Sequence, residues 1–182
     1  MSKKIDYFRI ILHVIAWIIF VGLSIEAAGF LVNTIATLTY TPEGAKRFWT
    51  QVDLSALYHH NLTYYITLTS LICIVTILKA IMFYVIVIVF YDKKVSMATP
   101  FNESVRKFIL KIAYLSIGIG LFSLWGEGNV KTIISEGVAM PDLGKMKLDG
   151  GSIWLFMSVI FLVIAQVFKK GIEIQNENDL TV

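Results

Sequence analysis

Four long apolar segments limit what this chain can fold into: residues 10–38, 62–90, 108–124 and 153–168. Each is close to the ~20 residues that a helix needs to cross ~30 Å of hydrocarbon. The segments contain no turn signals, and a helix satisfies its own backbone hydrogen bonds in lipid. With 57% hydrophobic and only 16% charged residues, the composition is also that of a membrane protein. The sequence predicts an all-α integral membrane protein, with one domain over residues 1–182 and four transmembrane helices in an antiparallel bundle.

The Lys and Arg residues outside these segments predict the orientation. Ten of them lie on one side: Lys3, Lys4, Arg9, Lys93, Lys94, Arg106, Lys107, Lys111, Lys169 and Lys170. Five lie on the other side: Lys46, Arg47, Lys131, Lys145 and Lys147. By the positive-inside rule, both termini are expected in the cytoplasm. The expected connections are two sizeable outer loops (39–61 and 126–152), a cytoplasmic turn (91–107) and a cytoplasmic tail (169–182).

Two charged residues lie within the apolar segments, Glu26 in the first and Lys79 in the second. A bare charge at such a depth costs several kcal/mol, so these residues usually face the protein interior and pair. We therefore predict an intramembrane Glu26–Lys79 ion pair. At helical spacing, Asn33 shares a stripe with Glu26, and Thr69 and Thr76 share one with Lys79. The pair is interpreted first as a structural contact that fixes helix register, and alternatively as a proton- or ligand-responsive site.

Few residues suggest catalysis or a cofactor. His59 and His60 are weak metal-ligand candidates, because neighbours on a helix point in different directions. The sequence has no GxSxG, HExxH or phosphate-binding glycine loop, and its single cysteine excludes an internal disulfide. The small, dispersed net charge of +3 argues against direct nucleic-acid binding. We expect no catalytic activity, no cofactor and no metal, and interpret Gly118 and Gly120 as positions where another helix approaches closely.

The connection between the second and third segments carries several helix-boundary signals. Pro100 interrupts the chain, Asn102 is a suitable N-cap, and Glu103 suits the first helical turn. Arg106 and Lys107 are then expected at an anionic lipid surface. This connection is either a turn with topology-setting charges or a docking surface for a cytoplasmic partner.

The turn "TPFNESVRKFILKIAYL" and the ending "AQVFKKGIEIQNENDLTV" resemble the YoaS-like bacterial membrane proteins (domain of unknown function 2975). The matching features are Pro100-Phe101, Arg106-Lys107, Lys170-Gly171, and the stretch from Glu177 through Asp179 to Val182. The resemblance implies four spans over the whole chain and a place in the bacterial inner membrane. It implies no activity, because the family has no established one.

Members of that family are often encoded beside small helix-turn-helix regulators of the Cro type. The resemblance therefore implies a sensing or regulatory protein that restrains such a partner, contacted by the tail (Glu177, Asp179) or by the Pro100–Phe101 turn with Arg106 and Lys107. The alternative is a transport or permeation component with Glu26 and Lys79 lining a polar path. Small faces on several helices also leave homo-oligomerisation open, and the lipid bilayer is an expected partner in every case.

Overall fold

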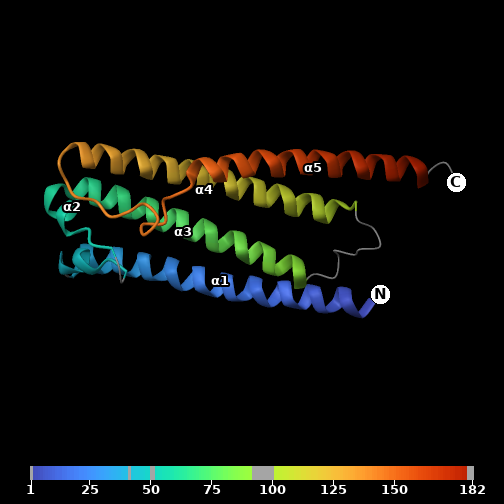
Figure 1. The fold of residues 1–182 in the computed structure, drawn as a ribbon, viewed down its shortest axis with the longest axis horizontal. Coiled ribbons are helices and arrows are strands. Elements are labelled where there is room, and N and C mark those ends of the chain that lie inside the picture. The colour runs from blue at the N-terminus through green and yellow to red at the C-terminus, as the bar shows by residue number, and fades with distance from the viewer. Residues whose placement is uncertain (1, 41, 50–51, 92–100, 180–182) are drawn as a thin grey trace.

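The computed structural model describes residues 2–40, 42–49, 52–91 and 101–179 (Figure 1). Its elements in chain order are α1 (Ser2–Thr39), the 3-10 helix η1 (Pro42–Arg47), α2 (Ser55–His60), α3 (Leu62–Tyr91), α4 (Glu103–Ser135) and α5 (Gly151–Asp179). Within the described residues, four helices are long and apolar enough to cross a membrane, namely α1, α3, α4 and α5. The predicted all-α fold with four membrane-spanning helices is confirmed.

The four long helices run antiparallel and lie side by side in the order α1, α3, α4, α5 (Figure 1). The two outermost helices are the least buried. In the most apolar 18-residue stretch of each helix, 11% of the residues are buried in α1 and 17% in α5, against 39% in both α3 and α4. We call α1 and α3 the first helix pair, and α4 and α5 the second helix pair. One end of the row, the loop end, carries η1, α2 and residues 136–150, and the opposite end, the terminus end, carries the start of α1 and the end of α5.

Helix α4 continues beyond its predicted end at residue 124, so the predicted outer loop 126–152 is too long. The extension to Ser135 keeps a helical pattern of buried residues, Val130 and Ile133. An ion pair between Glu127 and Lys131, with 2.7 Å between their charged atoms, adds support across one helical turn. The polar residues that follow residue 124 therefore do not end this helix, because the face that packs against the protein stays apolar.

Helix α5 begins halfway along α4 rather than at its end. A Cβ added to Gly120 would lie 3.0 Å from the carbonyl oxygen of Gly151, so the two backbones nearly touch there. This confirms the interpretation of Gly120 as a position of close helix approach. Residues 136–150 consequently run back along the other helices from the loop end to reach the start of α5 (Figure 1).

The loop end holds part of the hydrophobic core of the molecule. Fully buried side chains from α1, η1, α2, α3 and the 136–150 segment meet there, among them Phe30, Phe48, Leu57, Met146 and Leu148. Met146 and Leu148 are 0% exposed, so the returning segment is anchored in the core at these two positions, whereas much of the rest of it is exposed. Non-helical backbone is tolerated beside membrane-spanning helices only where protein buries it or it lines a water-filled cavity, and around Met146 and Leu148 the protein buries it.

Trp49, which follows η1 in the chain, packs against α1. Its indole covers Gly29 so closely that a Cβ there would overlap the ring, and Trp49 itself has a φ of +41°, rare for a bulky residue. We expect Gly29→Ala to displace the indole and lower the free energy of unfolding by about 1 kcal/mol, at the low end for overpacking because a side chain can move aside.

The measurement is the Trp49 contribution to tryptophan fluorescence, obtained by difference from Trp49→Phe, together with stability in detergent. Gly22→Ala on the same helix is the matched control, because a Cβ at Gly22 meets nothing within 4 Å. Equal emission spectra for Gly29→Ala and Gly22→Ala would contradict this packing.

Candidate functional site

Lys147, in the segment that returns from α4 to α5, connects three parts of the fold. Its Nζ lies 2.9 Å from Oε1 of Glu26 on α1. Its carbonyl oxygen accepts a hydrogen bond of 3.0 Å from Nζ of Lys79 on α3. We call Glu26, Lys79 and Lys147 the lysine clamp. One residue of the segment that joins α4 to α5 thus binds both helices of the first pair.

The backbone at Lys147 adopts an unusual conformation to make both contacts. Its φ is +61°, in the left-handed region that residues with a Cβ seldom occupy. The buried neighbours Met146 and Leu148 hold the backbone on either side, and Leu148 packs on Gly126 of α4. This anchoring allows the carbonyl to face Lys79 while the side chain reaches Glu26. Sparsely populated backbone conformations of this kind persist only when the surroundings impose them.

The predicted Glu26–Lys79 ion pair is wrong in its partner. The two residues do come to one place, as expected for antiparallel neighbours, but the ion pair of Glu26 is made with Lys147. Lys79 instead uses its ammonium group on a carbonyl oxygen and lies 5.9 Å from the ring centre of Trp154. The apolar segments alone could not indicate this partner, because the counter-ion of Glu26 comes from the segment that joins α4 to α5.

The position of Trp154 also shows how far along each helix the lysine clamp lies. Glu26 is about 24 Å along α1 from Ile10 and about 20 Å from Thr39, at a rise of 1.5 Å per residue. Trp154 lies in the first turn of α5, so the same cluster is at the very start of that helix. The clamp is therefore near the middle of the apolar part of α1 (Ile10–Thr39) but at one end of α5.

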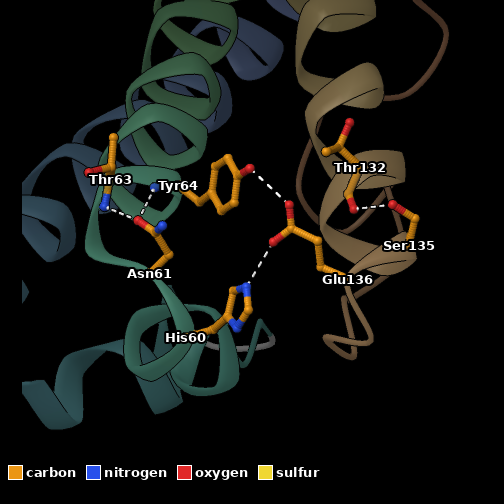
Figure 2. Close-up of polar contacts among 7 residues, drawn as sticks. All are labelled: His60, Asn61, Thr63, Tyr64, Thr132, Ser135 and Glu136. Atoms are coloured by element: carbon orange, nitrogen blue, oxygen red, sulfur yellow. Dashed lines mark hydrogen bonds and ion pairs between the residues drawn. The ribbon is translucent and has the colours of Figure 1, made fainter.

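A second polar cluster joins the two helix pairs at the loop end (Figure 2). Glu136, which follows α4, lies with Oε2 2.8 Å from Nε2 of His60 at the end of α2. Its other oxygen accepts a hydrogen bond of 2.9 Å from the hydroxyl of Tyr64 on α3. An ionised carboxylate only accepts, so His60 donates from Nε2 in this contact. We call His60, Tyr64 and Glu136 the histidine clamp.

The histidine clamp predicts a loss of stability in acid. The hydrogen bond from His60, and then that from Tyr64, hold the pKa of Glu136 below its usual value of 4.5. A carboxyl with a depressed pKa contributes stability that is fully present above its unfolded-state value and is lost as the pH falls through its folded-state value. We expect the thermal midpoint of the wild type to fall more steeply below about pH 4.5 than that of Glu136→Gln.

The measurement is a series of thermal melts of both proteins in the same detergent. Asp53 also has a lowered pKa, because Ser55 donates hydrogen bonds to it, but it is present in both proteins and cancels in the comparison. Parallel pH profiles for the two proteins would show that the clamp does not contribute in solution.

The predicted polar stripes are divided among different contacts. Asn33 donates a 3.3 Å hydrogen bond to the carbonyl of Arg47 in η1 and so helps to hold the loop-end cap. Thr69 and Thr76 are buried and hydrogen-bond to carbonyl groups of their own helix. Thr34 on α1 and Cys73 on α3 make a polar contact, with 3.7 Å between Oγ1 and Sγ. Each stripe residue therefore has a hydrogen-bond partner other than Glu26 or Lys79.

At the terminus end, the residues that carry the family resemblance contact one another. The ring of Phe101 packs on Gly171, and its centre lies 5.4 Å from that of Phe168. Asn102 accepts a 2.9 Å hydrogen bond from the amide of Val105, which confirms it as the N-cap of α4. This packing of the start of α4 against α5 gives the two short motifs a structural role.

The remaining candidates for partner contact lie around this packing. Arg106 binds Glu103 within α4 at 3.0 Å, and Lys107 is exposed. Glu177 is exposed near the end of α5, and Asp179 is the last residue of that helix. Pro100 lies outside the described residues. The predicted tail thus begins as helix, supported by contacts of Lys169 and Lys170 with Glu173.

The two histidines suggested as metal ligands separate in the structure. His60 binds Glu136, whereas the ring of His59 contacts that of Tyr58, with 5.7 Å between ring centres. Among the described residues, no group of three or more His, Cys, Asp or Glu side chains is arranged to hold a metal ion.

Sequence reasoning missed Glu136 and Lys147. Both lie in a segment rich in Gly and mixed charges, where nothing in the local pattern distinguishes them from solvated loop residues. The alternation of Met146 and Leu148 around Lys147 was the one available signal, because two apolar residues flanking a charge indicate that the segment is anchored.

The fold and these clamps define a multi-pass helical membrane protein whose loop segment is tied into its spanning helices. Residues 39–182 match the family described as Protein of unknown function (DUF2975), and the chain belongs to this family. No curated protein and no solved structure matches the chain significantly.

Proposed function

We propose that this protein senses a stimulus at its loop end and regulates a partner at its terminus end, without catalysing a reaction. The observation that carries the proposal is the double attachment of residues 136–150. The histidine clamp holds the beginning of this segment and the lysine clamp holds its end. A segment that binds three other helices through titratable side chains is a suitable receiver, because a change in charge at either clamp alters how the helices are held together.

We propose that the terminus end lies on the cytoplasmic side of a bacterial inner membrane. The excess of Lys and Arg on that side supports this orientation. The partner we propose is a small helix-turn-helix regulator, on the strength of the association seen in the family. Helix α5 extends beyond the start of α4 (Figure 1), and Ile174 on this extension is 50% exposed. An exposed helix end with acidic residues fits a partner with a basic surface.

The test is capture of partners from native membranes in mild detergent. We expect the full chain to retain a cytoplasmic partner, and a chain that ends after Gly171 to lose it while still folding, because Phe101 keeps its contact with Gly171. Lys131→Met is the control for a surface charge away from that end. Retention of the same partner by the truncated chain would place the contact elsewhere. Flux of protons or solute in proteoliposomes that Glu26→Gln abolishes would replace the regulatory proposal with the transport alternative.

A further inference from the structure

We propose that the lysine and histidine clamps are the release points of a hinge between the two helix pairs. Opening them would let the pairs rotate and would change the spacing of α1 and α5 at the terminus end. The inference rests on the proposed function in treating the loop end as the end that receives the stimulus. It adds the moving parts and the contacts that control them.

Each helix pair is held together internally by close packing. In the second pair, Gly120 and Gly151 bring the α4 and α5 backbones nearly into contact, and at the other end Phe101 packs on Gly171. In the first pair, the ring centre of Phe20 on α1 lies 5.6 Å from that of Tyr84 on α3, and Thr34 Oγ1 lies 3.7 Å from Cys73 Sγ. Such packed units are expected to move as rigid bodies, because tight interiors transmit displacement instead of absorbing it.

The polar contacts between the pairs are placed asymmetrically. Glu26 and Lys79 belong to the first pair and bind Lys147, which is carried by the second. His60 and Tyr64 precede or begin α3, and they bind Glu136 at the end of α4. Both clamps thus cross the same boundary, between α3 and α4. The ion pairs of Arg106 and Glu173 at the terminus end, in contrast, are each made within one helix.

This asymmetry determines how the structure would respond to a change in charge. Along most of the α3–α4 boundary the contact is apolar packing, which has no directional requirement. Elsewhere it depends on two carboxylates, Glu136 at the loop end and Glu26 partway along α1, that are each matched to a cationic or hydrogen-donating partner. Loss of either charge leaves a partner unsatisfied, and the positive φ of Lys147 favours rearrangement of its segment once the contacts are lost.

The test measures the distance between spin labels in the full chain in lipid nanodiscs. Labels at Tyr7→Cys on α1 and Ile174→Cys on α5 report on the terminus end, and both positions are exposed, at 66% and 50%. Cys73 is buried and is replaced by serine in every sample. We expect the Glu26→Gln/Glu136→Gln protein to show a mean distance shifted by more than about 2 Å, or a second distance population, relative to the parent.

Two further variants make the result decisive. Lys131→Met breaks the Glu127–Lys131 pair within α4, which crosses no boundary, and should leave the distance unchanged. A milder variant is used if the Glu26→Gln/Glu136→Gln protein does not fold. It combines Tyr64→Phe, which removes one hydroxyl from the histidine clamp, with Lys147→Met. This variant should shift the distance in the same direction. An unchanged distance in every folded clamp variant would overturn the hinge. A shift without any captured partner would instead support the hinge and reject the proposed function.

Discussion

Replacing Gly151 with alanine is expected to lower the free energy of unfolding by about 1–3 kcal/mol, the usual cost of overpacking a tight interior. A Cβ at this position would lie 2.9 Å from the backbone nitrogen of Leu124 and 3.1 Å from the carbonyl oxygen of Gly120. Backbone atoms of a helix cannot swing aside as a side chain can. The start of α5 must therefore move away from α4, and the returning segment with Lys147 must move with it.

Gly128→Ala provides the matched control for this experiment. Gly128 lies within α4, and a Cβ there meets nothing within 4 Å. Because alanine is the better helix former by up to about 1 kcal/mol, this variant should be as stable as the wild type or more so. Unfolding in mixed detergent micelles measures both. Equal stability of Gly151→Ala and Gly128→Ala would mean that α4 and α5 are not in backbone contact.

Removing the charge of Glu26 should have an effect of similar size. Glu26→Ala removes the counter-ion of Lys147 and leaves the ammonium groups of Lys147 and Lys79 close together, with Asp149 as the remaining carboxylate that acts on Lys79. Hydrogen bonds to charged groups contribute about 1.5–3 kcal/mol, and we expect the lower part of that range. The side chain of Lys147 is 38% exposed and that of Glu26 is 25% exposed, so solvent weakens the pair.

Two double-mutant cycles distinguish the observed partner from the one that the sequence suggested. In the Glu26→Gln/Lys147→Met cycle, the double variant should lose less stability than the two single variants together, since either substitution already breaks the contact. The Glu26→Gln/Lys79→Met cycle should show a smaller coupling, because these two side chains are linked through Lys147. A larger coupling for Glu26 with Lys79 would contradict the lysine clamp.

Lys147→Gly adds a check on the backbone. Glycine removes the ion pair but adopts a φ of +61° without a steric cost and keeps the carbonyl that accepts from Lys79. Its loss of stability should therefore be smaller than that of Lys147→Ala. The difference between these two variants measures the strain at this position, separately from the charge.

Much of this architecture follows from the sequence alone. Segments of about 20 apolar residues must be helical in a bilayer, because no other arrangement satisfies an isolated stretch of backbone there. The starts of α3 and α4 were also predictable: Leu62 opens the second apolar segment, and Asn102 is followed by the acidic first turn that N-caps favour. The small residue Gly120 indicated a close helix approach, since only a missing side chain allows two backbones to meet.

The tertiary structure alone decided where residues 136–150 lie and which charges they offset. Sequence periodicity reports how one element is oriented, but a segment without regular structure has no period to read. Lys147 became the partner of Glu26 because α5 begins halfway along α4, which requires the chain to return along the helices before it can continue. The four spans were determined by local hydrophobicity, whereas the clamps arose from the packing of residues between 68 and 121 positions apart in the chain.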